Sequence, residues 1–206
     1  MYSKFENLDE QKRQRILNAA MKEFAAKGYD DASTNAIVEQ AGISKGLLFH
    51  YFKNKKQLFL YLYRHSVELI SSQVMARIDF NETDVFKKLH DVQIVKFDLI
   101  RMHPDIMEFL QNAYLEQSPD VRQDLQSSGR ELLQQNISRV FQNIDYTLFR
   151  SDIDPGSIIN TVVWAFEGFA NDTLRKAKMA GAAVDYEKMY DDADKYMVFL
   201  RQSFYK

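Results

Sequence analysis

Hydroxyl, basic and aromatic side chains gather between residues 33 and 56, in the sequence STNAIVEQAGISKGLLFHYFKNKK. Side chains of these types bind the phosphates and base edges of DNA. The pattern predicts a short helix over 34–40, a break at Gly42, where a positive φ suits glycine, and a second helix that begins at Ser44. The hydroxyl of Ser33 or Thr34 can cap the first helix and that of Ser44 the second. We interpret the pair as a helix-turn-helix.

The second of these helices has two dissimilar faces. Leu48 and Phe52 are four residues apart and are expected to pack inward with Ile43. Apolar side chains exposed beside a lysine are unfavourable in water, but in the major groove Leu47 can touch thymine methyl groups and Lys45 can reach guanine acceptors. The outward face near the helix N-terminus is predicted to carry Lys45, Gly46, Leu47, Phe49 and His50.

This stretch closely resembles the recognition region of the TetR (tetracycline-repressor-like) family of bacterial regulators. The similarity rests on residues 41–55, Gly28-Tyr29 and Ser33-Thr34, and it covers roughly the first 60 residues. The resemblance implies a homodimer, DNA contacts from the head and a ligand pocket in the body. Phe49 stands where many members have tyrosine, so that position is left with apolar contact only. Residue by residue, the resemblance implies phosphate contacts from Thr34, Ser44, Tyr51 and Lys55, and base or groove contacts from Lys45, Gly46, Leu47, Phe49 and His50.

The rest of the chain predicts further helices that must position this motif. Apolar residues at helical spacing run from Gln11 to Lys27, and Gly28 is expected to end that helix. Asn54 and Gln57 resemble a capping box at the start of a long helix. Pro104, Pro119 and Pro155 each suit a first helical position, and helices are also predicted over 121–144, 155–179 and 186–204. We therefore predict an all-α fold of about nine helices, with a three-helix head over 1–54 and a ligand-binding and dimerisation body over 55–206.

Composition narrows the class of protein further. The chain has 206 residues and no cysteine, which excludes a disulfide framework and thiolate chemistry and fits a reducing cytoplasm. No apolar run approaches the roughly 20 residues of a membrane helix, so no membrane partner is expected. Residues 1–60 carry 10 Lys and Arg against 7 Asp and Glu, whereas the remainder carries 17 against 22, which gives +3 and −5. A basic head on an acidic body agrees with a DNA contact confined to one end.

Enzyme classes find little support in the sequence. The four histidines, His50, His65, His90 and His103, form no HExxH or Glu-x-x-His pattern that would build a metal site on a helix. The seven glycines form neither GxGxxG nor a P-loop. We expect no catalytic residues, no metal and no cofactor.

The body carries aromatic and methionine residues on predicted helices. Each of these could be a core residue or could line a pocket for a small apolar or aromatic effector. Glu116, Glu167 and Asn171 could supply polar specificity or could lie on a solvated face. The predicted pocket residues are Phe97, Met102, Met107, Tyr114, Trp164, Glu167 and Asn171.

Long apolar stripes on the last two predicted helices indicate a dimer interface. A four-helix bundle from two chains buries more of such stripes than one chain alone. The predicted interface residues are Ile159, Val162, Val163, Phe166, Met197, Leu200 and Phe204.

These observations predict a sequence-specific transcriptional regulator, a repressor that binds a palindromic DNA operator as a homodimer and is released by a small apolar or aromatic effector. The alternative is a helical module that binds a protein partner without any role for DNA. An acidic surface over the second motif helix would favour that alternative, and a basic surface disfavours it.

Overall fold

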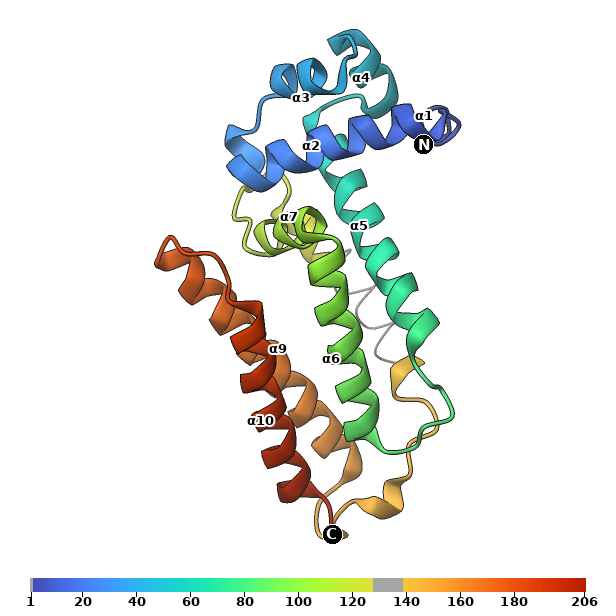
Figure 1. Ribbon diagram of the computed structural model, residues 1–206, viewed down its shortest axis with the longest axis vertical. Coiled ribbons are helices and arrows are strands. Elements are labelled where there is room, and N and C mark those ends of the chain that lie inside the picture. The colour runs from blue at the N-terminus through green and yellow to red at the C-terminus, as the bar shows by residue number, and fades with distance from the viewer. Residues whose placement is uncertain (1, 128–138) are drawn as a thin grey trace. The chain divides into compact units, whose positions relative to one another are not determined.

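The computed structural model describes residues 2–127 and 139–206, apart from the side chain of residue 178. The described residues form helices, with one isolated β-bridge between Phe149 and Tyr205, which confirms the predicted all-α class (Figure 1). The named elements are α1 (Ser3–Glu6), α2 (Glu10–Asp31), α3 (Thr34–Ala41), α4 (Lys45–Phe52), α5 (Lys55–Arg77), α6 (Val85–Met102), α7 (Pro104–Tyr114), η1 (Tyr146–Leu148), α9 (Pro155–Met179) and α10 (Tyr186–Phe204).

The chain divides into two compact units. Unit 1 contains the residues up to Ser72 together with Ile100–Gln135, and unit 2 contains Gln73–Leu99 and Asn136–Lys206. Unit 1 therefore holds the predicted head and, in addition, the first part of α5 and all of α7. The functional division between residues 54 and 55 stays a prediction.

The core of unit 1 joins the head helices to α7. Phe24 on α2, Phe59 on α5 and Phe109 on α7 are each almost completely buried, and their ring centroids lie 4.9, 5.4 and 6.5 Å apart for the pairs 24–59, 59–109 and 24–109. Burying a side chain of this size stabilises the fold by about 1.5–3 kcal/mol. The three rings therefore hold α2, α5 and α7 together as one body.

Helix α2 bends at Gly28. The sequence predicts that the helix ends at Gly28, and this residue has non-helical dihedral angles, with φ 70° and ψ −173°. Helical residues nevertheless continue beyond it to Asp31. A side chain at position 28 would be strained because of this positive φ. The glycine thus redirects the chain toward the start of α3.

Unit 2 is built around α9 and α10, which pack side by side (Figure 1). Pro155 opens α9 as predicted, and Asp154 and Asp185 cap the two helices by accepting from the backbone N–H groups of Ser157 (2.8 Å) and Lys188 (3.0 Å). The core of unit 2 contains Val85, Phe86, Ile144, Phe149, Ile158, Val162, Met197 and Leu200.

Two predicted helix boundaries in the middle of the chain need correction. Pro104 is at the first position of α7, but Pro119 lies in a turn and helical residues begin at 122. The helix predicted over 121–144 is helical at 122–127 and at 139–140, and a turn at 141–143, with φ 59° at Asn143, ends it before Ile144. Residues 128–138 of this predicted helix lie outside the described residues.

Three of the predicted interface residues, Val162, Met197 and Leu200, belong to the core of unit 2. Val162, Met197 and Leu200 are buried, and Ile159, Val163, Phe166 and Phe204 are half-buried. The apolar side chains that α9 and α10 leave exposed include Trp164, at 67%, and Phe199, at 62%, with Tyr196 and Val198. The predicted interface on α9 and α10 stays a prediction, and these exposed side chains are further candidates for it.

Within the described ranges, no helix is long and apolar enough to cross a membrane. Nor do the described His, Asp and Glu side chains form a group of three that could hold a metal ion.

Candidate nucleic-acid interface

Local hydrogen bonds define both ends of α3 and the start of α4. The Ser33 hydroxyl, rather than that of Thr34, accepts from the Ala36 N–H at 3.4 Å, and the Ser44 hydroxyl accepts from the Leu47 N–H at 3.2 Å. Gly42 ends α3 in the left-handed region, with φ 65° and ψ 40°. Its N–H and that of Ile43 donate to α3 carbonyls, which satisfies the helix end. The predicted helix-turn-helix is confirmed in these details.

Helix α4 buries one face and presents the other. Leu48 and Phe52 have no exposed surface, as predicted, and Ile43 packs against the same core. Ser44, Lys45, Gly46 and His50 are exposed, whereas Leu47, Phe49, Tyr51 and Thr34 are half-buried. The predicted DNA-binding residues of α4 therefore share one accessible face, although its two apolar members are less exposed than we expected.

Lys45 and Gly46 are the most open part of this face. The Lys45 ammonium lies 6.0 Å from the centroid of the Phe49 ring, a cation–π distance, so an aromatic ring at position 49 can steady the lysine without a hydroxyl. A Cβ added at Gly46 would meet no described atom within 4 Å. The protein itself places no packing demand on a glycine at this position.

Lys55 contacts the protein more closely than the family resemblance implies. Its ammonium donates to the carbonyl oxygens of Asp30 (2.9 Å) and Ala32 (3.3 Å), and it lies 4.8 Å from the centroid of the Tyr29 ring. An ammonium has three N–H donors, so one remains for a phosphate. Lys55 thus ties the start of α5 to the end of α2, and its phosphate contact stays a prediction.

Glu23 holds the junction between α2 and α3. Its carboxylate accepts from the Ser33 N–H at 2.9 Å and pairs with Lys27 at 2.9 Å. Burial acts to raise the pKa of Glu23, but the Ser33 N–H and the Lys27 ammonium outweigh it, and the pKa lies below its ordinary value. The carboxylate therefore stays ionised and orients the residue that caps α3.

A set of polar contacts connects α2 to α7 and to the segment after it. We name this set the α2–α7 latch. The Tyr29 N–H donates to Glu116 Oε2 at 2.9 Å, Asn112 Nδ2 donates to the Ala25 carbonyl at 2.6 Å, and the Ser118 hydroxyl donates to Asp30 Oδ1 at 2.8 Å. The sequence pattern does not predict these contacts, because partners 87 or 88 positions apart leave no local signal. Glu116, which we considered for a pocket, instead binds backbone N–H groups.

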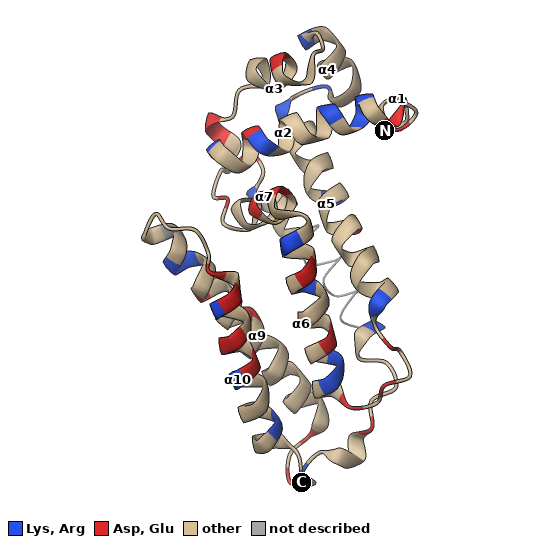
Figure 2. Cartoon of the chain, in the orientation of Figure 1, with Lys and Arg blue, Asp and Glu red and all other residues tan. Residues whose placement is uncertain are grey.

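The charges around α4 favour an anionic partner. Residues 43–56 contain Lys45, His50, Lys53, Lys55 and Lys56 and no acidic residue. Figure 2 shows Lys and Arg on α2 and α4, and the acidic residue of α3, Glu39, lies outside this segment. The surface over α4 is basic, which disfavours the protein-partner alternative.

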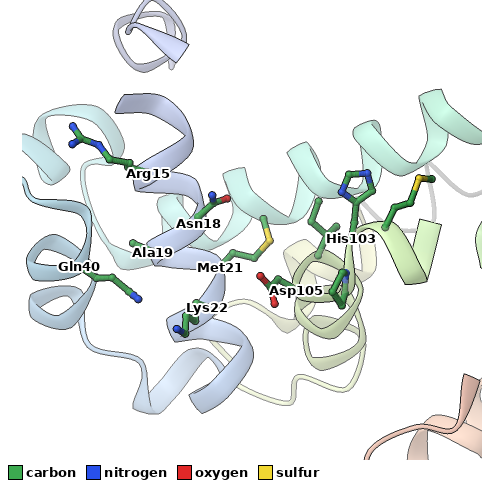
Figure 3. A pocket seen from close by; sticks show the side chains of 11 residues that line it. Arg15, Asn18, Ala19, Met21, Lys22, Gln40, His103 and Asp105 are labelled. Atoms are coloured by element: carbon green, nitrogen blue, oxygen red, sulfur yellow. The ribbon is translucent and has the colours of Figure 1, made fainter. Parts of the chain in front are cut away.

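A hollow of about 420 Å³ lies in unit 1 between α2, α3 and the start of α7 (Figure 3). Six of its eleven lining residues are polar or charged: Arg15, Asn18, Lys22, Gln40, His103 and Asp105. Of the predicted pocket residues, only Met102 lines it. The hollow is thus unlike the apolar pocket that we predicted.

The other predicted pocket residues are divided between the units. Met107 and Tyr114 belong to unit 1, and Phe97, Trp164, Glu167 and Asn171 belong to unit 2. Tyr114 and Trp164 are mostly exposed, at 56% and 67%, whereas Phe97 packs on Tyr190 with ring centroids 5.1 Å apart. Neither unit contains the whole predicted set.

Comparison with known proteins gives sequence matches in the N-terminal part of the chain. Residues 16–62 match the family described as bacterial regulatory proteins, tetR family. The chain is 35% identical over 66 residues to the transposon Tn10 TetC protein of Escherichia coli, covering 32% of this chain and 34% of that protein. It is 38% identical over 63 residues to the transcriptional repressor AcnR of Corynebacterium diphtheriae, covering 31% and 33%. The chain thus spans about a third of the length of the curated relatives it matches.

Solved structures extend the likeness to the whole fold. SmeT, the repressor of the Stenotrophomonas maltophilia multidrug efflux pump SmeDEF, superposes with a TM-score of 0.70 at 15% identity, over 98% of this chain and 93% of SmeT. A TetR-family regulator from Chloroflexus aurantiacus gives a TM-score of 0.62 at 21% identity, over 99% and 98%. At these identities the likeness establishes the fold.

Proposed function

We propose that this chain is a sequence-specific DNA-binding transcriptional repressor, because residues 16–62 match the tetR family of bacterial regulatory proteins and the chain has the fold of TetR-family regulators. The observation that carries this proposal is the exposed face of α4, where Lys45, Gly46 and His50 stand open on a helix-turn-helix whose other face is fully packed. The matched family is one of regulators rather than enzymes. Since its target would be operator DNA, we infer that the protein works in the cytoplasm.

Each exposed residue of α4 has a role in this proposal. Lys45 donates to guanine O6 or N7, and Leu47 and Phe49 make apolar contacts in the groove. Gly46 lets the backbone approach the bases. Thr34, Ser44, Tyr51 and the remaining N–H of Lys55 bind phosphates, which position the helix in the groove.

The working form in this proposal is a homodimer on a palindrome. A twofold dimer would place two α4 helices in successive major grooves, about 34 Å apart. Trp164, Tyr196 and Phe199, which are exposed aromatic residues of α9 and α10, support an interface on those helices. Large exposed aromatic side chains are the kind that a partner covers.

A small apolar or aromatic effector completes the proposal. An effector that binds one conformation of the body better than another by about 1–3 kcal/mol would change DNA affinity about 5- to 150-fold. The α2–α7 latch supports this mechanism, because a movement of α7 would carry α2 and the α3 junction with it.

Selection from randomised duplexes tests the DNA-binding proposal. We expect the protein to enrich a palindrome, and Lys45→Ala to weaken operator binding by a factor of about 5–150 while random duplex loses much less. Lys22→Ala, a lysine on α2 that lines the hollow, serves as the matched control. If no duplex is enriched, the proposed function is wrong; if Lys45→Ala weakens both duplexes equally, Lys45 is a phosphate contact instead.

A further inference from the structure

The N-terminal residues pack on the recognition helix α4. Phe5 of α1 is completely buried, with its ring centroid 4.6 Å from that of Phe52 and 5.7 Å from that of Tyr51. Tyr2 is also buried, and its hydroxyl donates to Gln57 Oε1 at 2.8 Å. These contacts hold α1 against the end of α4, although the sequence pattern predicts no helix there.

This packing places Lys4 beside the predicted DNA-binding face. Lys4 is exposed between the buried Tyr2 and Phe5, and its Nζ lies 3.4 Å from His50 Nε2. An ammonium has no acceptor, so Lys4 donates and the imidazole nitrogen accepts. The contact uses one of the three ammonium N–H groups, and two remain for other partners.

A second exposed lysine follows His50 by three residues, in a strained turn. Lys53 has φ 63° and ψ −47°, and the Asn54 N–H donates across it to the Phe52 carbonyl at 2.7 Å. This is a γ-turn with positive φ, which is rare and strained for a residue with a side chain. Gly42 ends α3 with a positive φ but without this strain. A lysine at position 53 thus costs stability that a glycine would not.

We propose that Lys4 and Lys53 bind phosphates of the DNA backbone next to His50, which extends the DNA interface beyond the helix-turn-helix itself. This inference rests on the proposed DNA-binding function. Both lysines lie near His50 at the end of α4, one held there by buried aromatic residues and the other kept in a backbone conformation that favours glycine. Neither forms an ion pair with a carboxylate of the described residues. Phosphate is the anion that a DNA surface offers to such cations.

Salt dependence of operator binding tests the proposal. Each phosphate contact contributes about 0.9 to the slope of log affinity against log salt. Since a dimer carries each lysine twice, Lys4→Ala and Lys53→Gly are each expected to make this slope less steep by about 1.8. When the salt concentration rises from 50 to 200 mM, the loss of affinity of each variant should therefore be about 12-fold smaller than that of the wild-type protein. The probe is the duplex selected by the wild-type protein, titrated at several salt concentrations.

Charge-preserving and distant variants provide the controls. Lys4→Arg and Lys53→Arg should keep the wild-type slope, and Lys22→Ala should also keep it. Lys53→Gly should in addition raise the thermal midpoint because it removes the strain, which separates loss of binding from loss of folding. Wild-type slopes for Lys4→Ala and Lys53→Gly, in a protein that binds its operator, would overturn this inference alone. Failure of the wild-type protein to bind any duplex would instead overturn the proposed function.

Discussion

Glu116 is the residue of the α2–α7 latch whose removal has the clearest expected effect. Its Oε2 accepts from the N–H of the buried Tyr29 at 2.9 Å, and its Oε1 accepts from the N–H groups of Gln117 and Ser118 at 2.8 and 2.9 Å. Glu116→Ala leaves the Tyr29 N–H without an acceptor at the Gly28 bend. The cost of such an unsatisfied donor is about 1–3 kcal/mol.

We therefore expect Glu116→Ala to lower the free energy of unfolding by about 2 kcal/mol, measured by urea denaturation followed by circular dichroism. Since Tyr29 leads directly to Ser33 and Thr34, we also expect operator affinity to fall at temperatures where the variant remains folded. Glu116→Gln keeps one carbonyl acceptor, so its loss of stability should be about half as large.

The control and the refuting result are both specific. Glu108→Ala, on the exposed side of the helix that precedes Glu116, should change stability by less than about 0.5 kcal/mol. If Glu116→Ala stays within that range too, the Tyr29 contact contributes little and the latch does not position α3. If stability falls but operator affinity does not, Glu116 stabilises unit 1 without positioning the DNA-binding face.

Individual residues of both units give three further predictions. Gly46→Ala should leave the free energy of unfolding unchanged or raise it by up to about 1 kcal/mol, because Ala favours a helix and its Cβ meets open space. The same variant should nevertheless bind the operator more weakly in a gel shift. Unchanged affinity would mean that the backbone at position 46 does not approach the bases. Trp164→Arg and Phe199→Arg should each give a folded monomer in light scattering, whereas Val162→Arg should lose helicity because Val162 is buried. If the Trp164→Arg, Phe199→Arg double variant remains a dimer, the proposed interface on α9 and α10 is wrong. Burial lowers the pKa of His65 below its ordinary value of 6.5, so the folded state resists protonation and the free energy of unfolding should decrease as the pH falls below 6.5. Urea denaturation at about pH 7.5 and about pH 5.5 should show a smaller decrease in the free energy of unfolding for His65→Gln than for the wild-type protein. An equal decrease in both proteins would mean that His65 does not cause this pH dependence.

Features that depend on neighbours within a few residues could be predicted from the sequence. Ser44 and Asn54 could be recognised as caps because their partners, Leu47 and Gln57, are three residues away. Gly42 could be recognised because its positive φ is a property of one residue. The period of the apolar residues likewise predicted that Leu48 and Phe52 are buried, since helical geometry places residues four apart on one face.

Features that depend on distant parts of the chain could not be predicted in this way and became visible in the folded structure. The sequence pattern suggests that Lys55 is a free basic residue, yet its ammonium donates to carbonyl oxygens of residues 23 and 25 positions earlier. The sequence pattern suggests that Glu116 is a surface or pocket residue, yet its carboxylate accepts from the backbone N–H of Tyr29 on α2.

Helix α9 shows the same limit most clearly. Helical periodicity marks Val162 and Trp164 alike as apolar positions on α9, but the structure buries the first to 1% exposure and leaves the second 67% exposed. Periodicity states which residues share a face. Which face the chain covers is decided by long-range packing, whose energy depends on elements that no local pattern specifies.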